Sequence, residues 1–143
     1  IINKKAKIFS QLVKEKVIKS EYIKGVIEFI TNNSNTPKFI CTGTPENEIK
    51  DIVQQRNIYS YFTDVFGSPK SKEQIINNIL VKWNLNPNEV LFFGDAMTDL
   101  HASLKCKLNF IGIKNCDTVF PKDTKLIDDF FDKYLCEIKF ITK

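Results

Sequence analysis

Residues 90–99, Val-Leu-Phe-Phe-Gly-Asp-Ala-Met-Thr-Asp, constrain the fold of this chain more than any other segment. Four apolar residues in a row are typical of a strand that is buried on both faces, as in a parallel sheet. The run stops at Gly94, and the carboxylates Asp95 and Asp99 follow, four residues apart. In an open α/β sheet, ligands bind at the carboxyl ends of the strands. Because carboxylate oxygens suit a hard cation such as Mg²⁺, this segment predicts a metal site.

The size and composition are those of one globular domain. The chain has 143 residues, of which 43% are hydrophobic, and a net charge of +4. No apolar run approaches the roughly 20 residues of a membrane-spanning helix. The lysines are scattered and lack the interleaved aromatic residues of nucleic-acid binders. We therefore expect a cytoplasmic protein with neither a membrane nor a nucleic acid as its partner.

The cysteines argue against a zinc site. The chain has four cysteines, which are far apart and form no Cys-x-x-Cys pair, and it has one histidine. Cys41, Cys106 and Cys136 have apolar neighbours, which predicts buried thiols in a reducing compartment.

Hydrophobic spacing predicts alternating helices and strands. Residues 6–30 have helical spacing in two pieces, with the second helix beginning at Ser20 or Glu21. Strands are predicted at 38–41, 64–66, 90–93 and 108–113, and helices at 44–57, 71–83, 96–105 and 126–135. This alternation, with short connections, predicts a parallel, doubly wound α/β sheet.

Two further positions carry candidate chemistry. Thr42 follows a strand and precedes a helix amino terminus, so its hydroxyl could bind a phosphoryl oxygen or merely turn the chain. Thr44 and Pro45 are predicted to be the cap and first residue of that helix. Ser71 and Gln74 have capping-box spacing, which places Lys72 at the first position of the next helix.

A cation at the first helical position opposes the helix dipole by about 0.3–1 kcal/mol, so something negative is expected near Lys72. The alternative is that Lys72 is an ordinary surface lysine. Asp95 and Asp99 likewise have an alternative role, as a helix cap and a first-turn acid. His101 lies two residues after Asp99, so on a helix it points away from that carboxylate, and we assign it no role.

Taken together and in order, these motifs resemble those of the haloacid dehalogenase-like (HAD) hydrolase superfamily, in its branch with small helical caps. Thr42 matches the second motif, Lys72 the third, and Gly-Asp-x-x-x-Asp at 94–99 the fourth. The resemblance covers roughly residues 20–113. It implies a Rossmann-like core at 35–143, preceded at 1–34 by a helical remnant of the cap and its return helix.

The resemblance also implies a role for each matching residue. Thr42 and Gly43 would bind the transferred phosphoryl group, and Lys72 would neutralise its charge. Asp95 would bind Mg²⁺, with Asp99 supporting or sharing the metal. Such sites act mainly by electrostatic stabilisation of a phosphoryl-transfer transition state. Phosphatase activity on a small phosphorylated metabolite is the leading expectation, and a phosphomutase or phosphonate hydrolase is an alternative within the family.

The first motif of the superfamily, Asp-x-Asp, is missing. No aspartate precedes Asp51, and the chain begins with Ile rather than Met. We therefore expect the nucleophile to lie upstream of this chain. We also expect an upstream segment or a second chain to supply the central strand of the sheet, since an empty central position would leave backbone groups unpaired. The rival hypothesis is a non-catalytic domain that binds phosphate and metal without turnover.

Overall fold

A computed structural model describes residues 3–4, 6–9 and 23–140. Six strands form one parallel sheet in the order β4-β3-β2-β5-β6-β7, and a separate parallel pair joins β1 to β8. The strands are β1 (Asn3–Lys4), β2 (Ala6–Phe9), β3 (Lys38–Pro45), β4 (Asp64–Ser68), β5 (Val90–Gly94), β6 (Asn109–Ile113), β7 (Leu126–Ile127) and β8 (Lys139–Phe140).

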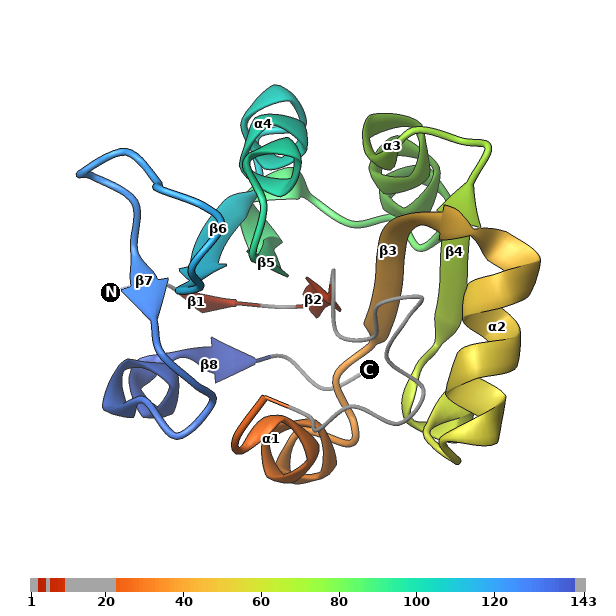
Figure 1. The fold of residues 1–143 in the computed structure, drawn as a ribbon, viewed down its shortest axis with the longest axis horizontal. Helices are drawn as coiled ribbons and strands as arrows, with labels where there is room; N and C mark the ends of the chain where they lie inside the picture. The colour runs from red at the N-terminus through yellow and green to blue at the C-terminus, as the bar shows by residue number, and fades with distance from the viewer. Residues whose placement is uncertain (1–2, 5, 10–22, 141–143) are drawn as a thin grey trace.

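Helices cover both faces of this sheet (Figure 1). The α-helices are α1 (Val26–Asn32), α2 (Glu46–Gln55), α3 (Lys72–Lys82) and α4 (Met97–Lys105). Short 3₁₀-helices lie at Tyr59–Tyr61, Pro87–Glu89 and Lys133–Glu137. The predicted doubly wound α/β fold is therefore confirmed.

Alternate residues of β3, β5 and β6 belong to two different hydrophobic cores. Leu91 and Phe93 of β5 pack on the side of α1 and α2, whereas Val90 and Phe92 pack on the side of α3 and α4. All four are fully buried. A strand that is apolar on both faces is what a sheet with helices on both faces requires, and this agreement confirms the interpretation of residues 90–93.

The amino-terminal prediction is partly wrong. Residues 6–9, predicted to be helical, form β2, which pairs in parallel with both β3 and β5. Pairing on two sides, with strands far along the chain, outweighs a local helical pattern. Residues 10–22 of the predicted helices lie outside the described residues, and α1 confirms the helical prediction from Val26 onward.

This arrangement bears on the expected upstream segment. The position between β3 and β5, which we expected an upstream segment or a second chain to fill, is occupied in this sheet by β2. The requirement for another segment in the whole protein stays a prediction.

The carboxyl-terminal prediction is wrong as well. Residues 126–135 do not form one helix, because Leu126 and Ile127 pair with β6. Further on, the Asp129 carboxylate accepts a hydrogen bond from the Phe131 amide (2.8 Å), and such a local bond to the backbone competes with helix formation. The Asp132 carboxylate accepts one from the Tyr134 amide (2.9 Å) and caps the short 3₁₀-helix at Lys133–Glu137.

The predicted burial of three cysteines is partly wrong. Cys41 and Cys106 are buried as predicted, but Cys136 is exposed, so its predicted burial is wrong. Among the described helices, none is long and apolar enough to cross a membrane.

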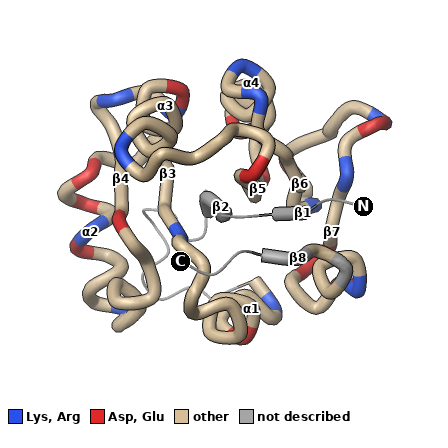
Figure 2. Tube along the Cα trace, turned by 180° about the vertical axis from the view of Figure 1, so that it is seen from behind, with Lys and Arg blue, Asp and Glu red and all other residues tan. Residues whose placement is uncertain are grey.

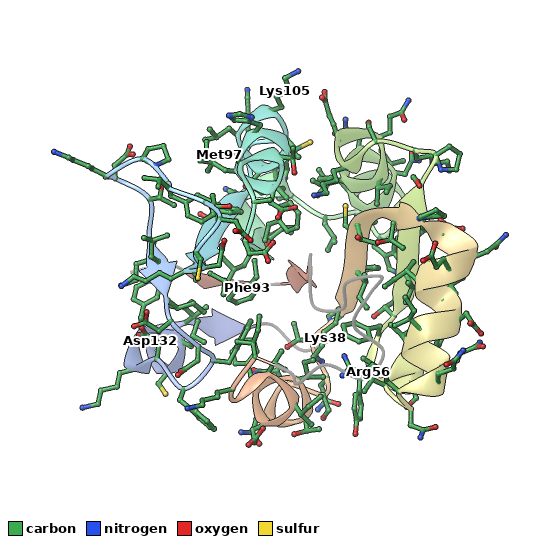
Figure 3. The ribbon with its side chains drawn as sticks, viewed as in Figure 1. Lys38, Arg56, Phe93, Met97, Lys105 and Asp132 are labelled. Atoms are coloured by element: carbon green, nitrogen blue, oxygen red, sulfur yellow. The ribbon has the colours of Figure 1, made fainter. Side chains whose placement is uncertain are left out.

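Lys38 is a buried lysine at the start of β3. Its ammonium donates hydrogen bonds to the carbonyl oxygens of Thr36 (2.9 Å) and Asn33, which follows the last residue of α1. Figure 3 shows Lys38 between β3 and α1, at the edge of the sheet opposite the strands' carboxyl ends. Only 1% of the residue is exposed, and burial lowers the pKa of Lys38 from 10.5 to about 8.

This shift predicts a pH-dependent stability. Between pH 8 and 10.5 the unfolded chain holds a proton on Lys38 that the folded chain has lost, so raising the pH favours folding. Relative to Lys38→Met, the wild-type free energy of unfolding should rise by about 1 kcal/mol from pH 7 to pH 9, measured by urea denaturation. Burial also raises the pKa of Cys41 and Cys106, which opposes this trend at high pH but is common to both proteins. If the free energies of unfolding of the two proteins changed in parallel with pH, the prediction would be contradicted.

Candidate active site

The carboxyl ends of the parallel strands form the edge of the sheet where the predicted residues gather. Thr42 lies near the end of β3, and Asp95 directly follows β5. Only β2 separates these two strands, so their ends lie about 10 Å apart at the usual strand spacing. Lys72 begins α3, which follows β4 on the other side of β3. Figure 2 shows the acidic residues at the junction of β5 and α4.

An ion pair joins α3 to α4 at this edge. The Lys72 ammonium donates a 2.6 Å hydrogen bond to Asp99 Oδ1 and a 3.1 Å hydrogen bond to Thr98 Oγ1. The Lys72 side chain is 12% exposed and the Asp99 side chain is fully buried. Two of the three ammonium N–H groups are thus engaged with α4, and within the described residues the third has no recorded acceptor.

The helix that presents Lys72 begins as the sequence predicts. The Ser71 hydroxyl accepts a hydrogen bond from the Gln74 amide (3.1 Å), and the Gln74 side chain accepts one from the Ser71 amide (2.9 Å). This capping box confirms the predicted start of α3 and places Lys72 at its first position. The negative group expected beside Lys72 is Asp99, so Lys72 is not an ordinary surface lysine. Lys70, two residues earlier, is exposed.

Asp99 is locked into the first turn of α4. Its Oδ2 accepts a hydrogen bond from the Ala96 amide at 3.1 Å, while its Oδ1 accepts the one from Lys72. The residue before α4 is Ala96, so Asp95 is not the helix cap, and the alternative that we considered for Asp95 does not hold. Asp99 is a first-turn acid and also the ion-pair partner of Lys72.

Thr42 is buried and tied to Thr44. Its hydroxyl accepts a hydrogen bond from the Thr44 amide (3.2 Å) and lies 3.4 Å from the Thr44 hydroxyl, where the pairing of β3 with β4 is irregular. The predicted cap at Thr44 is wrong, because Pro45 is the capping residue and α2 begins at Glu46. Gly43, between the two threonines, is exposed and has open space around its Cα.

The described residues do not offer a sulfur nucleophile here. Cys41 precedes Thr42, and its thiol lies 3.8 Å from the Lys72 carbonyl oxygen. Burial raises the pKa of Cys41 to about 12, against the opposing effect of the Lys72 charge. A thiol with that pKa stays protonated and is a weak nucleophile near neutral pH.

The donors at this edge fit Mg²⁺. The described residues contain no group of three or more His, Cys, Asp or Glu side chains suited to a metal ion. Mg²⁺ commonly keeps several water ligands and uses one or two carboxylates, so a smaller donor set is sufficient. Asp95 is 9% exposed and follows the end of β5, whereas Asp99 is fully buried and its two oxygens face Lys72 and the Ala96 amide. This favours Asp95 as the direct ligand and Asp99 as its support.

Thr98, whose hydroxyl helps to hold Lys72, was not predicted from the sequence. Its position directly before Asp99, on the same helical turn, could have indicated this role. His101 is exposed and lines a pocket of about 420 Å³ between α3 and α4, together with Gly43, Lys72 and Lys105. We assign His101 no role.

Gly94 leaves room for Asp99. A Cβ added at Gly94 would lie 2.4 Å from Asp99 Cβ and 2.7 Å from its Oδ2, whereas one added at Gly43 would meet nothing within 4 Å. We expect Gly94→Ala to lower the free energy of unfolding by about 1–3 kcal/mol through overpacking. Gly43→Ala, the matched control, should lower it by less than about 0.5 kcal/mol. Equal effects of the two substitutions, measured by urea denaturation, would refute this account of Gly94.

Among curated proteins, the chain is similar to a phosphoglycolate phosphatase of Vibrio vulnificus, with 32% identity over 69 residues. This match covers 45% of the chain and only 30% of the Vibrio protein, so the chain spans less than a third of that relative.

Solved structures share the fold at low sequence identity. An uncharacterized protein from Listeria monocytogenes has a TM-score of 0.71 at 15% identity, with 93% of this chain and 97% of that chain covered. A HAD-superfamily hydrolase from Ehrlichia chaffeensis has a TM-score of 0.67 at 20% identity, with 90% and 62% covered.

The family model described as haloacid dehalogenase-like hydrolase matches residues 2–113, which is most of the chain. This range contains all the motif residues discussed above. The chain therefore belongs to the haloacid dehalogenase-like hydrolase family.

Proposed function

We propose that this chain is part of a Mg²⁺-dependent phosphatase that acts on a small phosphorylated metabolite through an aspartyl-phosphate. The observation that carries the proposal is the buried Lys72–Asp99 ion pair beside Asp95, at the carboxyl edge of a parallel sheet. Family membership and the similarity to a phosphoglycolate phosphatase support it. We also propose that the enzyme acts in the cytoplasm.

Each residue has a physical role in this proposal. Asp99 and Thr98 hold the Lys72 ammonium, whose third N–H would donate to a phosphoryl oxygen. The Thr42 hydroxyl and the exposed backbone at Gly43 would bind the same group from the β3 side. Asp95 would hold Mg²⁺, which when bound supplies charge stabilisation for phosphoryl transfer. The preorganised Lys72 ammonium and the hydrogen-bonding groups of Thr42 and Gly43 would be the protein's contribution to stabilising the transition state.

The nucleophile must come from outside this sequence. The three residues that follow β2 in the sequence are Ser, Gln and Leu, none of which is a carboxylate. Asp51, the first aspartate of the chain, is exposed on α2. An upstream aspartate would have to reach the edge between β3 and β5, so the strand that carries it would replace β2 or lie beside its end.

One observation favours a second candidate function. Because β2 already occupies the central position without an aspartate after it, the domain could bind phosphate and Mg²⁺ without hydrolysis. The sequence upstream of residue 1 separates the two candidates. An Asp-x-Asp at the end of an apolar run there supports the phosphatase, and its absence from the gene supports the binding domain.

Removal of the proposed metal ligand tests the phosphatase directly. In the whole protein, Asp95→Asn should abolish the Mg²⁺-dependent hydrolysis of a generic aryl phosphate, because the neutral amide binds a hard cation weakly. Initial rates at several Mg²⁺ concentrations provide the measurement. Unchanged rates would remove Asp95 from the site.

Removal of the proposed phosphate-binding cation is a separate test. Lys72→Met should lower kcat by about 10²–10³, the usual cost of losing one preorganised charge or donor. Lys70→Met is the matched control, because Lys70 is a nearby exposed lysine outside the site. If both variants lose the same small fraction of activity, Lys72 has no special role in turnover.

A further inference from the structure

Asn115, in the loop after β6, bridges the carboxyl ends of β5 and β6. Its side-chain nitrogen donates hydrogen bonds to the carbonyl oxygens of Asp95 (2.8 Å) and Ile113 (3.0 Å). Its side-chain oxygen accepts a hydrogen bond from the Asp117 amide (2.9 Å). Both N–H groups of the amide are therefore engaged with carbonyls, which also fixes the orientation of the amide.

The contact at Asp95 is the informative one. Asp95 lies between β5 and α4, where the chain turns sharply from strand to helix. On the helix side, the Ala96 amide is held by Asp99. On the strand side, the Asp95 carbonyl is held by Asn115 from the neighbouring strand's loop. The peptide that follows Asp95 is thus fixed at both its carbonyl and its amide, by side chains from two different elements.

We propose that Asn115 is a positioning residue for Asp95, fixing the backbone from which the carboxylate reaches the metal. The metal in this inference rests on the proposed function. The hydrogen bonds of Asn115 are observed and do not depend on it. A carboxylate on a fixed backbone loses less freedom when it binds a cation. Partners that orient a metal ligand in this way typically contribute 10–100-fold to metal affinity.

The chain contains a matched control for this role. Asn109, at the other end of β6, has a side-chain nitrogen that donates to the carbonyl oxygens of Asn88 (2.9 Å) and Val90 (3.3 Å). It joins β6 to β5 by the same chemistry at the amino-terminal ends of the strands, far from the site. Loss of either amide should loosen the strand pair similarly, but only loss of Asn115 should affect Asp95.

The first experiment compares Asn115→Leu and Asn109→Leu, which remove the amide with little change in size. Mn²⁺ binding to the whole protein, measured by electron paramagnetic resonance, should weaken by about 10–100-fold in the first variant. It should stay within about twofold of wild type in the second. Equal weakening in both variants would overturn the proposal, because the cause would then be a general loosening of the sheet.

The second experiment needs no metal. Amide hydrogen exchange at residues 95–97 should become faster in Asn115→Leu and also in Asn115→Asp, but not in Asn109→Leu. Asn115→Asp keeps the oxygen that accepts from the Asp117 amide, so it preserves the loop while placing a carboxylate oxygen against the Asp95 carbonyl. Wild-type exchange in Asn115→Asp would overturn the proposal and leave Asn115 as a loop residue.

These two measurements separate the failure of this inference from that of the proposed function. If exchange changes as expected but no protein, wild type included, binds Mn²⁺, the positioning of Asp95 is supported and the proposed metal site is refuted. If wild type binds Mn²⁺ and Asn115→Leu binds it equally well, the metal site is supported and the role of Asn115 is refuted.

Discussion

The ion pair between Lys72 and Asp99 is the interaction on which the rest of this site depends. A fully buried carboxylate is tolerated only when it is paired and hydrogen-bonded, and Asp99 has both Lys72 and the Ala96 amide as partners. The pair fixes the first turns of α3 and α4 relative to each other. It also offsets the unfavourable position of a cation at the start of a helix. The close approach of Asp99 to β5 in turn requires glycine at position 94.

Much of this arrangement follows from local sequence patterns. The strand at 90–94, the capping box at Ser71 and the start of α3 at Lys72 each depend on residues within a few positions of one another. Because parallel strands end at one edge of a sheet, the same patterns predict that Asp95 and Thr42 lie at a common edge. Local chemistry and sheet topology together therefore predicted how most of the candidate residues lie relative to one another.

The errors of prediction arise where distant parts of the chain decide the structure. Residues 6–9 have helical spacing, but their pairing with β3 and β5 makes them a strand. Residues 126–127 pair with β6, and Asp129 after them bonds the nearby backbone, so no single α-helix spans residues 126–135. The contact of Asn115 with Asp95 spans 20 residues and has no sequence signal, because an asparagine after a strand usually indicates only a turn.

The central claim is that Thr42, Lys72 and Asp95 hold an oxyanion beside a divalent cation. Crystals of the protein grown with Mn²⁺ and tungstate, a heavy analogue of phosphate, test it most directly by anomalous scattering. The account predicts a manganese peak at the Asp95 carboxylate and a tungsten peak between the Lys72 ammonium and the Thr42 hydroxyl. Peaks for both ions elsewhere on the protein, with none at this edge of the sheet, would contradict it.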